Sequence, residues 1–277
     1  MTDIVLVNDA RGMFSDDARS EVEPLLAAFK QRGVSARLGA WDDPTFDWAS
    51  TGLCVLRTPW NYHRKRAAFL EWVRTVPRLF NPPDVVAWNS HKGYLRSLEE
   101  RGVPIVPTEW LSRETMLDDV LERRGWSEAI LKPAVSAGSF RTKRFRRGDA
   151  PQALLSEILS EADAMVQPYL ASVDSSGERS IVFFGGKLSH AVKRHPPLAT
   201  GLHGGVAIAL PPDEQAFAER VLAAAPGPLL YARVDIARDE AGGLRLMELE
   251  VIEPSFFLDV VPEGAARFVE AVLERAH

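Results

Sequence analysis

Residues 231–251 read YARVDIARDEAGGLRLMELEV, and this stretch decides how we interpret the fold. Two strand-like runs flank Ala241-Gly242, which predicts an antiparallel hairpin with its turn at that pair. Asp235 then faces Glu248 across the hairpin, and Arg233 faces Glu250. Because side chains alternate between the faces of a strand, these four polar residues share one face. The opposite face is apolar and holds Val234, Ile236, Met247, Leu249 and Val251.

The three carboxylates of this face repel one another, since like charges that face each other across a sheet are destabilising. A bound cation would remove the repulsion, and Mg²⁺ prefers carboxylate oxygens combined with substrate phosphates. The alternative is an exposed polar face neutralised by Arg233 and water, and the pattern alone leaves both interpretations open. We therefore treat Asp235, Glu248 and Glu250 as candidate metal ligands.

A second informative stretch lies at residues 129–139, which read AILKPAVSAGS. An apolar strand ends in Lys132-Pro133 and leads into a loop of small residues, whose amide groups can approach a phosphate closely. The chain contains neither G-x-x-x-x-G-K-[ST] nor G-x-G-x-x-G. Such a loop is also common as a plain turn, but the preceding lysine and the later acidic hairpin favour phosphate binding. The candidate loop residues are Ser136, Ala137, Gly138 and Ser139.

The first 84 residues differ in pattern from the rest. Strand-like runs at 3–8, 34–41, 53–57 and 78–81 alternate with helical spacing at 17–32 and 64–76. This order predicts a small, mostly parallel sheet with helices on its faces. The later part mixes helices with antiparallel strands. Helices are expected at 90–101, 112–124 and 263–276 and after Pro211-Pro212, and strands at 103–110, 129–133, 140–146, 165–170, 179–184 and 188–194.

Composition restricts the class of protein. The chain has 277 residues, 46% of them hydrophobic, and a net charge of −5, which disfavours a specific nucleic-acid binder. No apolar run approaches the roughly 18 residues that cross a membrane, and the N-terminus lacks the features of a signal peptide. The single cysteine, Cys54, lies in an apolar strand-like run. We expect a cytoplasmic protein that binds neither nucleic acid nor membrane. Its oligomeric state is left open, and a homo-oligomer is compatible with the sequence.

Several motifs in this order resemble the ATP-grasp superfamily over essentially the whole chain. They are Asn89–Leu95 followed by Arg101–Pro104, then Lys132-Pro133, Val166–Leu170 and the carboxylates of the acidic hairpin. The resemblance implies an α/β domain at 1–84, an α+β lobe at 85–166 and a metal-binding α+β lobe at 167–277. ATP and Mg²⁺ are the implied cofactors. Glu250 stands where the superfamily usually has asparagine, which keeps an oxygen ligand and adds a negative charge.

The resemblance also implies nucleotide-binding roles. Lys92 and Lys132 would contact the phosphates, under the 136–139 loop. Glu178 would be a polar contact on the ribose or phosphate side. The adenine would meet the hinge formed by Gln167, Pro168, Tyr169 and Leu170.

The acceptor substrate is expected beyond the third strand, because ligands of open α/β sheets bind at the carboxyl ends of strands. Arg57 suits a carboxylate there. The alternative is a loop whose aromatic residues pack on the next lobe. The acceptor candidates are Arg57, Thr58, Trp60, Asn61, Tyr62, His203, Gly204 and Gly205, and the catalytic candidates are Arg194 and Arg233.

Within the superfamily, Arg57–Tyr62, Phe183–Lys193 and Met247–Pro254 are similar to a bacterial branch that includes a D-cycloserine-forming cyclo-ligase. The implied activity is an ADP-forming ligase that converts a small carboxylate, an amino acid or similar metabolite, into an acyl phosphate for attack by an amine. The alternatives are intramolecular cyclisation and a nucleotide-binding regulatory protein without turnover. The rival acceptor is a peptide or protein terminus.

Overall fold

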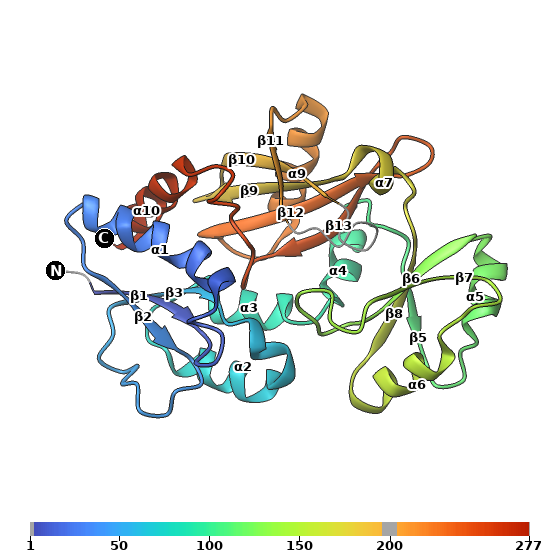
Figure 1. The fold of residues 1–277 in the computed structure, drawn as a ribbon, viewed down its shortest axis with the longest axis horizontal. Helices are drawn as coiled ribbons and strands as arrows, with labels where there is room; N and C mark the ends of the chain where they lie inside the picture. The colour runs from blue at the N-terminus through green and yellow to red at the C-terminus, as the bar shows by residue number, and fades with distance from the viewer. Residues whose placement is uncertain (1–2, 196–203, 277) are drawn as a thin grey trace.

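The computed structural model describes residues 3–195 and 204–276 and contains three sheets side by side (Figure 1). The first is parallel, in the order β2 (Ala36–Ala40), β1 (Ile4–Asn8), β3 (Leu53–Thr58) and β4 (Leu79–Phe80). The two inner strands, β1 and β3, are wholly buried because both faces of the sheet are covered. The predicted α/β architecture of this part is confirmed.

Two groups of helices cover the parallel sheet. Alternate residues of β1, such as Ile4 and Leu6, pack with α1 (Asp16–Gln31) and with the C-terminal helix α10 (Glu263–Ala276). The intervening residues pack with α2 (Arg66–Thr75). The short helix η1 (Trp60–Arg64) follows β3 directly. Helix α10 lies beside α1 in Figure 1, so the end of the chain returns to its beginning.

The second sheet is antiparallel and five-stranded, in the order β11-β10-β9-β12-β13. Its strands are β9 (Glu178–Phe184), β10 (Lys187–Arg194), β11 (Gly205–Ile208), β12 (Tyr231–Arg238) and β13 (Leu244–Glu250). Helix α9 (Pro212–Ala224) packs on the apolar face of this sheet. Gly185 and Gly186 form the predicted turn with positive φ angles, which glycine adopts without strain.

The acidic hairpin has the predicted pairing at its charged residues. Arg233 faces Glu250 and Asp235 faces Glu248. A β-bulge then shifts the register between Asp235 and Ile236, so that Ile236 pairs with Leu246. Met247 therefore lies on the polar side, against the expectation that it shares the apolar face, and it lines the cleft described below.

The third sheet has the order β5-β8-β6-β7 and is antiparallel. Its strands are β5 (Glu109–Leu111), β6 (Glu128–Pro133), β7 (Lys143–Arg146) and β8 (Ala164–Pro168). Helices α5 (Leu117–Arg124) and α6 (Gln152–Glu161) cover one face. Strand β8 continues to Pro168, so a boundary that keeps this sheet intact lies after residue 168 rather than 166. The division into three units stays a proposal.

Short helices connect the sheets, and here the sequence expectations differ from the structure. The expected helix 90–101 is present as the shorter α4 (Tyr94–Glu100). A separate helix that was not expected, α3 (Pro83–Asn89), precedes it and begins at Pro83, a position that needs no N–H donor. Only the last residues of the expected strand 103–110 form one. Helices α6 and α7 (Ser172–Ser176) and strand β11 were not expected.

Strand β13 is at the edge of its sheet, but neighbouring segments form hydrogen bonds with several of the backbone groups along its free edge. Val106 N donates to Leu246 O at 3.0 Å. Further along, Asn89 donates from Nδ2 to Leu249 O at 2.7 Å, and the Tyr94 hydroxyl accepts from Leu249 N at 3.0 Å. These contacts fix the acidic hairpin against α3 and α4. No helix within the described ranges combines the length and apolarity needed to cross a membrane.

Candidate active site

A cleft of about 950 Å³ lies between the two antiparallel sheets and reaches the carboxyl ends of the parallel strands. Its volume is in the range of small-molecule sites. All three sheets contribute to its walls. One end is lined by residues around β6, β8 and β13, and the other by α1, η1 and the segment after β13. The cleft thus extends from the two antiparallel sheets to the carboxyl end of the N-terminal sheet.

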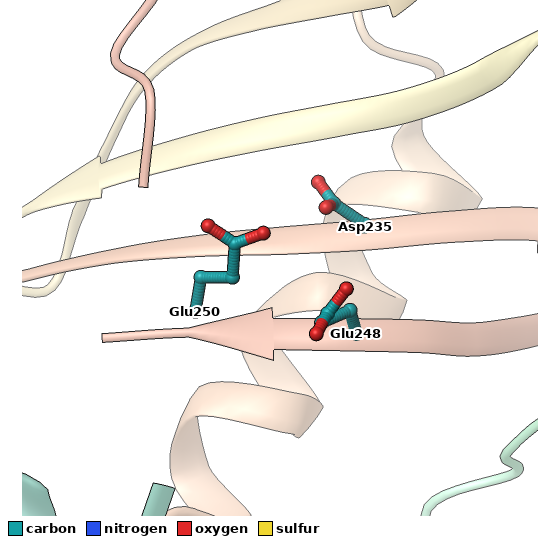
Figure 2. Close-up of side chains that lie close together, drawn as sticks. All are labelled: Asp235, Glu248 and Glu250. Atoms are coloured by element: carbon teal, nitrogen blue, oxygen red, sulfur yellow. The ribbon is translucent and has the colours of Figure 1, made fainter. Parts of the chain in front are cut away.

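The three predicted metal ligands do converge. Oxygen atoms of Asp235, Glu248 and Glu250 lie within 4.8 Å of one another, and Figure 2 shows their side chains on adjacent strands. Asp235 is buried and accepts from Ser180 Oγ at 2.7 Å and Arg233 Nε at 2.9 Å. Three hard oxygen donors on one face are the chemistry that suits a divalent cation, so these residues fit Mg²⁺.

Arg233 and Lys92 provide the positive charges that neutralise the three carboxylates. Arg233 pairs with both Asp235 and Glu250. Lys92 Nζ lies 2.7 Å from Glu248 and 3.4 Å from the carbonyl oxygen of Ser136. Burial raises the pKa of Glu250 to about 7, whereas Lys92 and Lys132 outweigh burial at Glu248 and lower its pKa to about 2.

Lys132 faces the same space from β6. It is half-buried, and among the described residues it forms no ion pair within 4.0 Å. Burial therefore dominates and lowers its pKa to about 8, although the charge of Glu248 opposes the shift. At Lys92, by contrast, Glu248 outweighs burial and raises the pKa. The pair provides one permanent and one titratable positive charge above the small-residue loop.

This difference predicts a pH dependence of nucleotide affinity. If a phosphate chain binds the protonated form of Lys132, the contribution of Lys132 to affinity is expected to be constant below a pH of about 8 and to fall above it, by up to about tenfold per pH unit. Calorimetry with ATP between about pH 7 and about pH 9.5 measures the slope. Glu250 and Glu253 titrate nearby, so Lys132→Met is the control that retains their contribution. Identical slopes in both proteins would contradict the assignment.

The part of the cleft around β6, β8 and β13 is apolar where it lies farther from the carboxylates. Side chains of Val106, Ile130, Val173 and Met247 line it next to the predicted hinge, Gln167–Leu170. The backbone N–H of Tyr169 already donates to Glu128 O at 2.9 Å, and Gln167 Nε2 donates to Thr108 Oγ1 at 2.9 Å. These bonds fix the hinge, so a base would meet its remaining backbone groups.

Glu178 lies closer to the carboxylates than expected. It accepts from Arg194 at 2.8 Å, and the same guanidinium group lies 3.7 Å from Asp235. Burial raises the pKa of Glu178 despite Arg194. Both residues line the cleft beside Arg233. The three catalytic and polar candidates are therefore brought together around the metal ligands.

The acceptor candidates divide into two groups. Trp60, Asn61, Tyr62 and Gly204 line the cleft. Gly205 pairs with Arg194 as the first residue of β11, and His203 lies outside the described residues.

The expectation that Arg57 and Thr58 contact a substrate is not met. Arg57 is completely buried, and Thr58 Oγ1 pairs with Asn8. Neither lines the cleft. Both residues still belong to β3, which ends at Thr58, one residue later than expected. The side chains that reach the cleft come from η1, which follows β3.

Sequence reasoning missed Glu253, which lines the cleft three residues after Glu250. Burial, with the charge of Glu250, raises its pKa to about 8, and Tyr62 lies at hydrogen-bond range. Its carbonyl oxygen accepts from Trp60 Nε1 at 3.3 Å. The motif Met247–Pro254 contains this residue, but its apolar neighbours gave no reason to assign it to the cleft.

A cleft between two antiparallel sheets, with two lysines opposite a carboxylate triad, is the arrangement that defines the ATP-grasp ligases. Comparisons agree. The chain is 32% identical to the cycloserine biosynthesis protein DcsG of Streptomyces lavendulae, over 98% of each chain. The crystal structure of D-cycloserine synthetase DcsG superposes with a TM-score of 0.90 at 31% identity, covering 99% of this chain and 100% of that one.

More distant structures share the fold. D-alanine–D-alanine ligase from Bacillus anthracis, complexed with ATP, has a TM-score of 0.73 at 14% identity and covers 100% and 97% of the two chains. The family model described as the N-terminal domain of D-cycloserine synthetase DcsG matches residues 4–81. The chain belongs to the DcsG family of ATP-grasp ligases.

Proposed function

We propose that this ligase uses ATP and Mg²⁺ to activate the carboxylate of an amino acid or similar small metabolite for attack by an amine. The observation that supports this most strongly is the cleft itself, in which Lys92 and Lys132 face Asp235, Glu248 and Glu250. The D-alanine–D-alanine ligase of the same fold is a complex with ATP, and the ligase PsnB, at 16% identity, is a complex with Mg and ADP.

The nucleotide would lie between the second and third sheets. Lys92, Lys132 and the amides of the 136–139 loop would bind the phosphates, with the adenine in the apolar end near Met247. Gly138 and Ser139 both have positive φ angles, which turn successive amides of the loop. Asp235, Glu248 and Glu250 would hold Mg²⁺, which neutralises phosphate charge when bound.

The proposed reaction has two steps. A carboxylate oxygen of the acceptor attacks the γ-phosphorus, and the bridging oxygen leaves with ADP, which gives an acyl phosphate. An amine nitrogen then attacks the carbonyl carbon, inorganic phosphate leaves, and the nitrogen loses a proton. Lys132 and Lys92 hold the phosphates in line, and Arg194 and Arg233 offer positive charge on the acceptor side. Such catalysis consists mainly of positioning and electrostatics.

A second candidate is the intramolecular version, in which the amine belongs to the activated molecule and the product is a ring. It is supported by the 32% identity with a cycloserine biosynthesis protein and by the match of residues 4–81, which form the acceptor side of the cleft. A peptide terminus is the rival of the small metabolite as acceptor, and a cytoplasmic location is part of the same proposal.

One experiment distinguishes these proposals. Purified protein with ATP and Mg²⁺ is mixed with D- and L-amino acids, including O-ureidoserine, and ADP and inorganic phosphate are measured. We expect stoichiometric ADP and phosphate with a subset of the panel. The mass of the product separates the two reactions, since a product from one substrate molecule indicates cyclisation and a product that joins two molecules indicates ligation. ATP binding without ADP formation under any condition would support a regulatory protein instead.

A further inference from the structure

The guanidinium group of Arg57 is buried at the junction of three segments. Nη2 donates to Glu21 Oε2 at 3.2 Å and to the carbonyl oxygen of Pro254 at 2.9 Å. The guanidinium carbon lies 3.4 Å from the centre of the Phe256 ring. A buried ion pair is expensive to desolvate and is weak evidence for a stabilising role by itself. The segments that the Arg57–Glu21 pair holds in place are therefore more informative than the pair itself.

Glu21, on α1, contacts the same segment as Arg57. Its carboxylate accepts from the backbone N–H of Phe256 at 3.0 Å and from the hydroxyl group of Ser255. Glu21 is itself 7% exposed and lines the cleft, whereas Arg57 does not, so an effect of Glu21 on the acceptor counts as positioning only together with a change in these residues. One side chain from α1 and one from β3 thus bind residues 253–257, which we call the acceptor loop. The loop begins three residues after Glu250.

The acceptor loop is part of the cleft wall. Glu253, Ser255 and Phe257 all line the cleft on the side of the N-terminal sheet. Phe257 has a φ of 52°, a left-handed conformation that is unfavourable for a bulky residue and persists only when its surroundings hold it. Its N–H donates to Ser255 Oγ at 3.2 Å. The Glu21–Ser255 contact therefore supports the strained residue directly.

The loop also touches the metal-side machinery. The Phe257 ring lies 5.7 Å from the guanidinium carbon of Arg233, which pairs with Asp235 and Glu250. The loop therefore forms a wall on the acceptor side, while the ion pairs of Arg233 with Asp235 and Glu250 are made without any atom of the loop. Lys132 and the hinge residues Gln167 and Pro168 belong to the third sheet, and within the described residues no hydrogen bond or ion pair joins them to the loop.

We propose that Arg57 and Glu21 are positioning residues that hold the acceptor loop in its strained conformation and thereby set acceptor affinity, without a role in binding ATP. This inference rests on the proposed function in assuming that the acceptor occupies the cleft beside residues 253–257. Arg57 thus acts on the acceptor through the loop rather than by contact. A misplacement of about 1 Å in such a wall can reduce turnover by up to about 100-fold.

Glu21→Gln tests the proposal, with Glu214→Gln as the matched control. Glu214 is also a buried glutamate, 4% exposed, and it pairs with Arg238 at 3.2 Å and Arg179 at 3.5 Å away from the cleft. Two readouts are used: steady-state kinetics for acceptor and ATP, and amide hydrogen exchange of the peptide spanning residues 252–258. Exchange needs no substrate, so it remains decisive if the proposed function fails.

Glu21→Gln is expected to raise the acceptor KM by about tenfold or more, to leave the ATP KM within about twofold, and to accelerate exchange at 252–258. Glu214→Gln is expected to lower Tm by about as much as Glu21→Gln does. It is expected to leave the acceptor KM and the hydrogen exchange at 252–258 unchanged. Unchanged exchange at 252–258 in Glu21→Gln would overturn the proposal, and so would faster exchange with an unchanged acceptor KM.

Ser255→Ala covers the case in which Glu21→Gln does not fold. It removes only the hydroxyl group between Glu21 and the Phe257 amide. Faster exchange and a raised acceptor KM would support the proposal, and no change in either would overturn it. If the unmodified enzyme turns over no member of the amino-acid panel, the proposed function fails, and the exchange comparison alone decides whether the pair holds the loop.

Discussion

Replacing Glu248 with glutamine is expected to abolish turnover, with a loss of at least about 100-fold in kcat. Glu248 is the carboxylate closest to the lysines that we propose to bind the phosphates, at 2.7 Å from Lys92 Nζ, and it belongs to the triad with Asp235 and Glu250. Glutamine keeps the shape and an acceptor oxygen for Lys92 but removes the charge that a hard cation requires. ADP release at saturating ATP and Mg²⁺ measures the effect.

The control for this variant is again Glu214→Gln, which removes a charge from a buried glutamate outside the cleft. We expect it to be active, and both proteins to show cooperative thermal unfolding. The Glu248 variant is expected to unfold at a somewhat lower temperature, because the low pKa of Glu248 shows that Lys92 and Lys132 stabilise its charged form in the folded protein. Near-normal ADP release from folded Glu248→Gln would show that the triad is not the metal site.

Replacing Lys132 with methionine is expected to weaken ATP binding by about 10- to 100-fold, the size of a lost hydrogen bond to a charged group. Methionine keeps much of the volume at the end of β6 and removes the charge that the phosphates would meet. Lys92→Met is expected to weaken binding as well, and in addition to leave Glu248 without its cationic partner. Calorimetry with ATP gives the dissociation constants directly.

Lys187→Met is the matched control for both lysine variants. Lys187 is an exposed residue of β10 that pairs with Glu274 at 3.5 Å, outside the cleft. Its loss should leave ATP affinity within about twofold, since exposed ion pairs contribute little. Unchanged ATP affinity in both Lys132→Met and Lys92→Met would be incompatible with a nucleotide in this cleft.

The acidic hairpin shows what the sequence could predict. Its alternation of polar and apolar residues and its glycine turn placed Asp235 opposite Glu248, as the structure has it. The bulge beside these residues was not predictable, because Met247 is apolar and suits either face of a strand. A bulge next to a site is a common way to redirect a side chain, and here it places two consecutive residues, Met247 and Glu248, in the cleft.

Arg57 shows where sequence reasoning failed. An arginine at the end of a parallel strand has the chemistry of a carboxylate-binding residue, and nothing near it in the chain suggested a partner. Its partners are Glu21, on the preceding helix α1, and the carbonyl of Pro254, at a separation of 197 residues. Contacts of this kind come from the docking of the last segment onto the first domain, which no local pattern encodes.

We propose that this cleft transfers the γ-phosphoryl group of ATP to a carboxylate. The most direct test is the fate of oxygen in the substrate carboxyl group. Amino acids of the panel labelled with ¹⁸O in the carboxylate are incubated with the enzyme, ATP and Mg²⁺, and the released phosphate is analysed by mass spectrometry. The account predicts one ¹⁸O atom in each inorganic phosphate, formed with ADP. Unlabelled phosphate, or AMP and pyrophosphate as products, would contradict it.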